Sequence, residues 1–180
     1  MRIISGKYKG RRITAPKNLP IRPTTDLAKE SLFNILNNRY HFSSLHVLDL
    51  CAGMGNISYE FGSRGAKQII SVDENAGCTK FIQQTSKEFD FPITVIKSDI
   101  FKYLEKTSQQ FDIIFADPPY DFEQLQFDSI ANSVFQNKLL NDDGILVIEH
   151  SKNTDFENHP NHSNTRKYGG SLFSFFELNP

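Results

Sequence analysis

The sequence predicts an α/β fold with a seven-stranded, mostly parallel sheet that ends in an antiparallel hairpin. Short apolar runs of five or six residues alternate with longer amphipathic segments, which is the pattern of strand–helix–strand units. A Gly-x-Gly loop follows the first of these runs directly, as it does at the start of many nucleotide-binding units. With 180 residues, of which 38% are hydrophobic and 23% charged, the chain is long enough to bury the core of one such domain.

Boundary signals define the predicted elements in chain order. Thr25 is a good N-cap, and the helix after it presents Ala28, Leu32, Ile35 and Leu36 on one apolar face. The predicted strands cover residues 46–50, 68–72, 93–97, 111–116 and 145–149, with a hairpin formed by 167–168 and 172–176 around Gly169-Gly170. Further helices are predicted over residues 56–64, 75–89, 101–108 and 122–138, and a turn over 141–144.

The chain divides into a basic N-terminal arm over residues 1–25 and an α/β domain over residues 26–180. Apolar Ile3, Ile4 and Ile13 flank a glycine-containing middle, which predicts an ordered β-hairpin. No acid precedes Asp26, and the basic residues are mixed with Gly and Tyr, a pattern that suits a phosphate backbone. The candidate nucleic-acid-binding residues are Arg2, Lys7, Lys9, Arg11, Arg12 and Arg22.

A turn of sequence Asp117-Pro118-Pro119-Tyr120 follows the apolar run of residues 111–116. The prolines end the strand because they cannot donate to a β-ladder. Ligands bind at this carboxyl edge in open α/β sheets. A rigid set of oxygen acceptors beside an aromatic ring can hold a planar group that bears an amine. Many methyltransferases that act on exocyclic or amide nitrogen resemble this turn, so Asp117, Pro118 and Tyr120 are the candidate catalytic residues.

The glycine loop after the first strand allows a ligand to approach the backbone closely. Gly53 and Gly55 lack a Cβ atom and permit a tight bend. The dinucleotide-binding fingerprint requires a third glycine, and that position is Ser58 here. The sequence therefore matches a nucleoside-binding loop but not a complete dinucleotide fingerprint.

An acid lies at or near the carboxyl end of each of the first three predicted strands. Asp49, just before the loop, suits a cationic ligand better than a pyrophosphate. Asp73 could accept from ribose hydroxyls and Asp99 from an adenine amine, although an acid at either position, taken alone, is more often a helix N-cap. A turn at the arm's end is expected to lean over the same site. The candidate cofactor-binding residues are Asp49, Ala52, Gly53, Gly55, Asp73, Asp99, Thr24 and Thr25.

The rest of the sequence argues against several classes of protein and of binding site. A net charge of −1 argues against a generally adhesive nucleic-acid binder. Cys51 and Cys78 do not suggest disulfides, and Cys51 has no basic neighbour that would activate it. His150, His159 and His162 lack regular ligand spacing, so we expect a solvated loop and no metal. No apolar run approaches the length of a membrane span and no signal peptide is visible, so we expect a cytoplasmic monomer without a membrane partner.

Over nearly its whole length, the sequence resembles the small-subunit ribosomal RNA guanine-N2 methyltransferases of the RsmD type. Four blocks carry the resemblance: residues 2–6 through 10–11, residues 22–26 with 30–34, residues 49–55 with 63–66, and residues 117–120. Tyr168-Gly169 also matches the closing hairpin of the family. The family usually has Phe, Ser and Gly where this chain has Cys51, Met54 and Ser58, and Glu where it has Asp73.

The resemblance implies a Rossmann-like class I fold and a specific reaction. A methyl group would pass from S-adenosylmethionine to the exocyclic N2 of the guanine at position 966, in the usual bacterial numbering, of 16S rRNA. The substrate would be 16S rRNA within an assembling small ribosomal subunit. Asp117 and the Pro118 carbonyl would accept hydrogen bonds from the amine, and Tyr120 would stack on the flipped base.

Three alternatives remain open at this point. A DNA adenine-N6 methyltransferase could use the same tetrapeptide, although residues 1–44 leave little room for a DNA-recognition region. A protein-glutamine methyltransferase more often has Asn where this chain has Asp117. A non-catalytic RNA-binding assembly factor could keep the fold, but it would not need the acids after all four strands.

Overall fold

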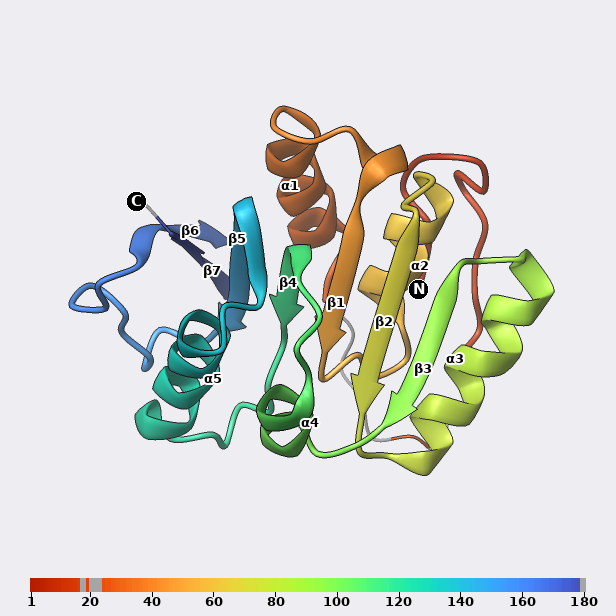
Figure 1. The fold of residues 1–180 in the computed structure, drawn as a ribbon. Helices are drawn as coiled ribbons and strands as arrows, with labels where there is room; N and C mark the ends of the chain where they lie inside the picture. Colours follow the sequence, from red (N-terminus) through yellow and green to blue (C-terminus); the bar gives the residue numbers. More distant parts are fainter. Residues whose placement is uncertain (17–18, 20–23, 179–180) are drawn as a thin grey trace.

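A seven-stranded mixed sheet forms the centre of the protein, as predicted, in a computed structural model that describes residues 1–16, 19 and 24–178 (Figure 1). The strand order is β3-β2-β1-β4-β5-β7-β6. The first five strands are parallel, and β7 pairs antiparallel with both β5 and β6. The strands are β1 (His46–Leu50), β2 (Gln68–Asp73), β3 (Ile93–Lys97), β4 (Phe111–Ala116), β5 (Leu140–His150), β6 (His162–Tyr168) and β7 (Ser171–Glu177).

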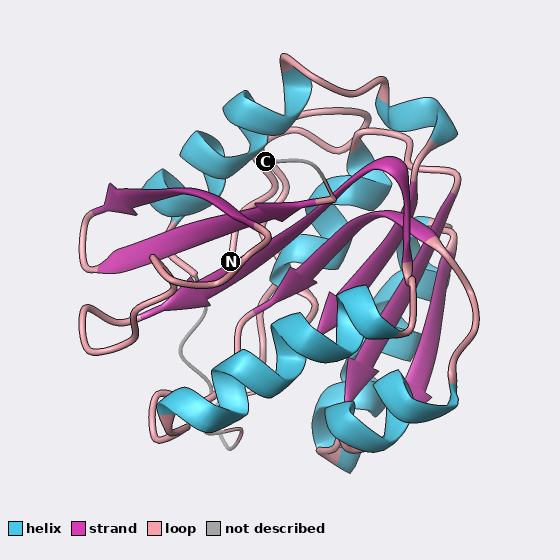
Figure 2. Cartoon of the chain, turned by 60° about the vertical axis from the view of Figure 1, so that its left-hand side comes forward, coloured by secondary structure: helices cyan, strands magenta, loops and turns pink. Residues whose placement is uncertain are grey.

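Helices cover both faces of the sheet and make a three-layer α/β/α arrangement (Figure 2). The helices are α1 (Asp26–Asn37), α2 (Asn56–Ser63), α3 (Ala76–Phe89), α4 (Ile100–Lys106) and α5 (Gln124–Gln136), with a short 3-10 turn η1 (Phe42–Ser44). Side chains of Thr25, Asn75 and Asp99 cap α1, α3 and α4 by accepting from backbone N–H groups. The predicted helices are confirmed, with ends that differ by at most two residues.

Two apolar cores lie on opposite faces of the sheet. Alternate residues of β1 point to different faces, so Leu48 packs with the core under α4 and α5, whereas Val47 packs with the core under α1 and α2. Both side chains are fully buried. Because β1 and β4 are covered on both sides, their carboxyl ends are fixed rigidly, and the loops that follow start from a defined position.

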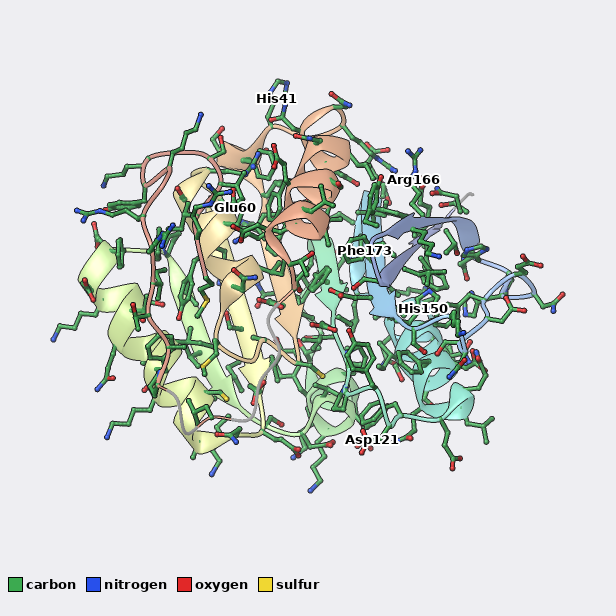
Figure 3. All side chains as sticks on the ribbon, turned by 180° about the vertical axis from the view of Figure 1, so that it is seen from behind. His41, Glu60, Asp121, His150, Arg166 and Phe173 are labelled. Atoms are coloured by element: carbon green, nitrogen blue, oxygen red, sulfur yellow. The ribbon has the colours of Figure 1, made fainter. Side chains whose placement is uncertain are left out.

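Two predictions near β5 are wrong in detail. The strand begins at Leu140 instead of Ile145, because Leu140 pairs with Phe111 before a shift in register, and the predicted turn over 141–144 lies within the strand. His150 does not lie in a solvated loop. It ends β5 at 2% exposure, with one ring nitrogen 2.7 Å from the Ser174 hydroxyl (Figure 3).

The first 13 residues form a short hairpin-like turn that lies against α2 and α3. Arg2 and Arg12 form an antiparallel bridge, and Ile3 and Ile13 are buried. Tyr8 contacts the edges of two phenylalanine rings near the end of α3, and its hydroxyl donates to the carbonyl of Phe89 at 2.8 Å. Arg22 lies outside the described residues.

A buried ionic network joins this turn to the domain. The Glu60 carboxylate accepts from the backbone N–H groups of Ile4 and Ser5 at 2.8 and 3.0 Å, and pairs with Arg64 at 2.8 Å (Figure 3). The Lys29 ammonium lies 3.8 Å from the same carboxylate and donates to the carbonyl of Arg2 at 2.6 Å. Burial lowers the pKa of Lys29, while Glu60 opposes the shift. The arm is therefore anchored by charged groups that water does not reach.

Candidate active site

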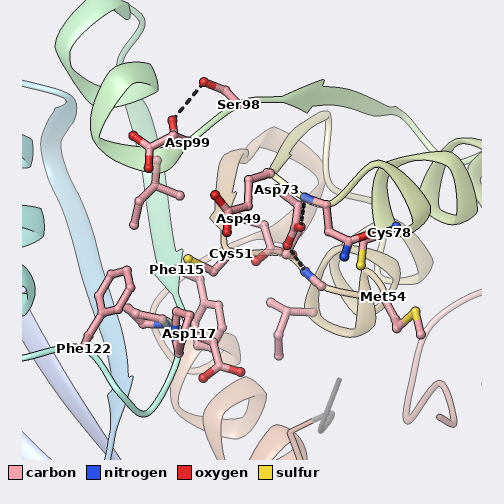
Figure 4. A pocket seen from close by; sticks show the side chains of 18 of the residues that line it. Asp49, Cys51, Met54, Asp73, Cys78, Ser98, Asp99, Phe115, Asp117 and Phe122 are labelled. Atoms are coloured by element: carbon pink, nitrogen blue, oxygen red, sulfur yellow. Dashed lines mark hydrogen bonds between the residues drawn. The ribbon is translucent and has the colours of Figure 1, made fainter. Parts of the chain in front are cut away.

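The carboxyl ends of β1 to β4 open into one cavity of about 730 Å³ (Figure 4). This volume is in the range of small-molecule sites. All of its charged lining residues are acidic, and none of the lysines and arginines that the structure describes lines it. The acids are Asp49, Asp73, Glu74, Asp99 and Asp117.

The loop after β1 has the backbone shape that its glycines allow. Gly53 and Gly55 have φ angles of 53° and 81°, in the left-handed region. Gly53 lines the cavity, and its N–H donates to the Asp73 carboxylate at 2.8 Å. Gly55 does not line the cavity. It precedes α2, and a Cβ atom there would lie 2.7 Å from the ring of Tyr59. Ala52 also lines the cavity and is buried.

Asp49 lines the cavity but exposes only 1% of its surface. Ser58 donates to its carboxylate through the backbone N–H at 3.1 Å and through the hydroxyl at 2.5 Å, and the same hydroxyl lies 2.6 Å from that of Ser71. Ser58, at the position of the missing third glycine, thus supports this acid. Burial raises the pKa of Asp49 to about 7, against the opposing effect of the Ser58 hydrogen bonds.

Asp73 and Asp99 stand at the ends of their strands, each with a structural partner. Asp73 accepts from the N–H groups of Gly53 and Asn75, both at 2.8 Å, and burial raises its pKa. Asp99 accepts from the N–H of Lys102 at 3.0 Å and so caps α4. Both acids also line the cavity, so capping and ligand binding are compatible at these positions.

The Asp117 turn forms the opposite wall of the cavity from Asp73 (Figure 4). The Asp117 N–H donates to the carbonyl of Leu50 at 3.3 Å, which ties the turn to the end of β1. Pro118 is buried, whereas Tyr120 is 54% exposed at the cavity's edge. Burial, followed by the charges of Glu149 and Asp49, raises the pKa of Asp117 well above its usual range.

The end of the arm reaches this wall through Thr24. Its hydroxyl donates to the buried Glu149 carboxylate at 3.0 Å, and its carbonyl accepts from the Asn56 side chain at 3.0 Å. Thr24 lines the cavity, but Thr25 does not, since it caps α1. Glu149 and Asn56 were missed by sequence reasoning. Glu149 lies near the end of an ordinary apolar strand, and only the sheet register indicates its neighbours.

The Cys51 thiol lines the same cavity, but it is not activated as a nucleophile. Burial and the surrounding carboxylates raise the pKa of Cys51 well above its usual range, so the thiol stays protonated. Its positive φ of 57° belongs to the tight loop. The described residues contain no group of three or more His, Cys, Asp or Glu side chains that could hold a metal ion. No described helix is long and apolar enough to cross a membrane.

The basic residues of the arm that the structure describes point into solvent. Arg2, Lys7, Lys9, Arg11 and Arg12 are all exposed. Arg2 pairs with Asp26 at 3.1 Å, and the Lys7 ammonium lies 5.0 Å from the ring centre of Tyr8. These charges do not line the acidic cavity, so the two features are separate surfaces of one domain.

Comparison with known proteins agrees with this arrangement. The model of the family described as Conserved hypothetical protein 95 matches residues 1–177. Ribosomal RNA small subunit methyltransferase D of Buchnera aphidicola subsp. Baizongia pistaciae is 31% identical over 150 residues, which cover 83% of this chain and 75% of the relative.

Solved structures show the same fold. The Escherichia coli protein yhhF, described as a methyltransferase, superposes with a TM-score of 0.86 at 24% identity, over 99% of this chain and 98% of the other. The Thermus thermophilus 16S rRNA N2 G1207 methyltransferase RsmC, solved with AdoMet and guanosine, superposes with a TM-score of 0.69 at 20% identity, over 88% of this chain and 45% of the other. The fold is that of class I S-adenosylmethionine-dependent methyltransferases, and the chain belongs to the Conserved hypothetical protein 95 family, the RsmD type of ribosomal RNA methyltransferases.

Proposed function

We propose that this protein methylates the exocyclic N2 of one guanine in small-subunit ribosomal RNA, at position 966 in the usual bacterial numbering, with S-adenosylmethionine as cofactor. One observation carries the proposal: the Asp117 turn shares a single acidic cavity with the carboxylates that end β1, β2 and β3. In this proposal, the site for a positively charged nucleoside and the acceptor for an amine share that cavity.

The charge of the cavity supports this cofactor over a dinucleotide. When bound, S-adenosylmethionine supplies an electrophilic methyl group on a positively charged sulfur, and it also carries an ammonium group. Asp49 and Asp73 favour such charges, whereas they would repel a pyrophosphate. Gly53 leaves room for close approach of the ligand, and Asp73 and Asp99 keep lone pairs that can accept from ribose and adenine.

The chain's own contribution to the reaction is orientation of the amine. The guanine N2 lone pair is delocalised into the ring, which makes the amine a poor nucleophile. Hydrogen bonds from its two protons to the Asp117 carboxylate and the Pro118 carbonyl favour a tetrahedral nitrogen whose lone pair points away from them, into the cavity. The exposed ring of Tyr120 offers a stacking surface for a base that has left its helix.

The RNA-binding part of the proposal concerns the N-terminal arm. Its exposed cations lie outside the cavity and can follow phosphates while the acidic cavity receives only the base and the cofactor. Arg22 is included in this proposal from its sequence position alone.

A methyl-transfer assay with isotopically labelled cofactor tests the proposal. Unmethylated small ribosomal subunits, their free rRNA, free guanosine, duplex DNA and a glutamine-containing protein fraction serve as substrates, and each product is digested to nucleosides or amino acids where needed. We expect label on N2-methylguanosine from small-subunit rRNA, and little transfer to free guanosine because phosphate contacts position the base. Label on N6-methyladenosine or on glutamine would reject the substrate, and no transfer to any of them would reject the activity.

A further inference from the structure

A buried asparagine at the start of α2 joins the N-terminal arm to the wall of the cavity. Asn56 is 7% exposed and lines the cavity. Its side-chain oxygen accepts from the Lys29 ammonium at 2.8 Å, and its side-chain nitrogen donates to the backbone carbonyl of Thr24 at 3.0 Å. Because an ammonium can only donate and a carbonyl can only accept, this position requires a side chain with both an acceptor and a donor. An amide meets the requirement, whereas a carboxylate lacks the donor.

The two partners of Asn56 belong to different parts of the molecule. Lys29 also donates to the carbonyl of Arg2 at 2.6 Å, and it lies 3.8 Å from the Glu60 carboxylate, which accepts from two backbone N–H groups of the arm. Lys29 is therefore held by the docked arm. Thr24, in contrast, is itself part of the cavity wall. One chain of contacts thus leads from the arm through Lys29 and Asn56 to the cavity.

Burial makes this chain of contacts sensitive to the position of the arm. Lys29 and Thr24 are only 1% and 8% exposed, and a buried polar group that loses its partner is strongly unfavourable. When the arm leaves α2, Lys29 loses the Arg2 carbonyl and becomes open to water, so it no longer fixes the Asn56 amide. The docked and undocked states of the arm therefore correspond to a fixed and a loosened wall at Thr24.

We propose that Asn56 is a positioning residue that couples docking of the arm to binding in the cavity, because it holds Thr24 in place while the arm holds Lys29. The inference deepens the proposed function and rests on it for its RNA partner, since that function assigns the arm to RNA and the cavity to S-adenosylmethionine. RNA that binds the docked arm and cofactor that binds the completed cavity then favour the same state of the protein. By linkage, each ligand strengthens the binding of the other.

Calorimetry with S-adenosylmethionine, in the absence of RNA, measures the coupling. Asn56→Ala removes both bonds and should weaken binding by about fivefold or more. Asn56→Asp keeps the acceptor for Lys29 but has no donor for Thr24, so it should also weaken binding, although its added negative charge alone would attract a positively charged cofactor. Asn137→Ala is the matched control, because Asn137 makes the same kind of bond, to the carbonyl of Leu104 at 3.0 Å, and does not line the cavity.

Undocking of the arm tests the same link from its other end. A Cβ atom on Gly6 would lie 1.9 Å from the carbonyl oxygen of Ser63 in α2, whereas nothing lies within 4 Å of that position on Gly10. Gly6→Ala should therefore weaken cofactor binding, and Gly10→Ala should not. When Gly6→Ala and Asn56→Ala are combined, the loss should be no greater than that of the more severe single variant, because both break one chain of contacts.

Limited trypsin digestion at Lys7 and Lys9 gives the reciprocal readout. In wild type, saturating S-adenosylmethionine should slow cleavage of the arm by about fivefold or more. In Asn56→Asp, cleavage without cofactor should be as slow as in wild type, because Lys29 keeps its acceptor, but the cofactor should give no further protection. A side chain that only stabilised the fold would not separate these two rates.

The outcomes separate this inference from the proposed function. If wild type transfers no methyl group to guanine, the proposed function fails, and calorimetry and digestion still decide the coupling. If folded Asn56 variants bind cofactor as wild type does, or if the losses from Gly6→Ala and Asn56→Ala add, Asn56 does not couple the two sites. Circular dichroism shows which variants are folded. Should the Asn56 variants fail to fold, a wild-type arm that is cleaved equally fast with and without cofactor would overturn the inference.

Discussion

At the residue scale, burial sets the charge state of the acids around the cavity. Asp49 and Asp117 both line it, and the pKa of each is raised chiefly because burial disfavours the ionised form. Burial therefore favours the protonated form of both acids, and the effect can be measured for Asp49.

The role of Asp117 leads to a prediction about turnover. Asp117→Ala should reduce the rate of methyl transfer by about 10²-fold or more, because the amine loses its orienting acceptor. Asp117→Asn keeps an acceptor oxygen and should retain more activity than Ala. Cofactor binding should stay near normal in both. Asp121→Ala is the control, since Asp121 is exposed four residues further along and does not line the cavity. Equal rates for Asp117→Ala and Asp121→Ala would contradict the assigned role.

Asp49 leads to a prediction about stability. Its pKa is about 7 in the folded protein and near 4 when unfolded, so the folded state binds more protons between these values. The stability that Asp49 contributes is present below about pH 4 and is lost as the pH rises through 7. Relative to wild type, Asp49→Asn should therefore gain up to about 4 kcal/mol of unfolding free energy between pH 4 and 8.

Urea unfolding of the cofactor-free protein across this pH range measures the effect. Asp142→Asn, at an exposed position, should follow the wild-type curve. A difference in unfolding free energy between Asp49→Asn and wild type that is the same at every pH would contradict the prediction. It would mean that Asp49 has the same pKa in the folded and in the unfolded protein.

At the scale of elements, the arm depends on one close approach to α2. The Lys7 N–H donates to the carbonyl of Ser63 at 2.7 Å, and a Cβ atom on Gly6 would lie 1.9 Å from the same carbonyl oxygen. Gly10 has a nearly equal φ, 82° against 83°, but nothing lies within 4 Å of its Cβ position. The two glycines thus share a backbone requirement and differ only in packing.

This pair gives a matched experiment on arm docking. Gly10→Ala should cost about 1 kcal/mol, from the left-handed backbone alone. Gly6→Ala should cost at least about 2 kcal/mol more, because the arm must leave α2 to remove the clash. Urea unfolding measures both costs, and limited trypsin digestion at Lys7 and Lys9 reports detachment. Equal costs and equal digestion would mean that the arm is not held at Gly6.

The exposed charges of the arm lead to a prediction about RNA binding. Replacing Arg11 and Arg12 together with Ala should weaken binding to small-subunit rRNA and reduce the slope of log affinity against log salt by up to about 2. Affinity for S-adenosylhomocysteine should hardly change. Lys106→Ala with Lys152→Ala, two exposed positions away from the arm, is the control. An unaltered slope in the Arg11 and Arg12 variant would remove the arm from the RNA interface.

At the scale of the whole molecule, the sequence predicted the structural features that depend on residues close together in the chain. Apolar runs located the strands, capping residues located the helices, and parallel strands brought Asp49, Asp73, Asp99 and Asp117 to one edge. The start of β5 was misplaced because Asn141 to Gly144 have turn chemistry, yet the strand continues across a register shift.

Contacts between residues far apart in the sequence were not predictable in the same way. Glu149 lies 125 positions after Thr24, and Lys29 lies 27 positions before Asn56, yet each pair is joined by a buried hydrogen bond. A buried lysine or glutamate has no local signature, because its partners are set by tertiary packing. His150 was misassigned for the same reason, since its ring is buried by the pairing of β5 with β7 and by the rings of Phe127 and Phe156.

The most direct test of the central claim is a mass map of small-subunit rRNA from cells that lack this gene. Restoring the wild-type gene should add one methyl group on guanine N2 at position 966, and a gene encoding Asp117→Ala should not add it. An rRNA that is identical with and without the gene, or a restored methyl group on adenine N6 instead of guanine N2, would contradict the account.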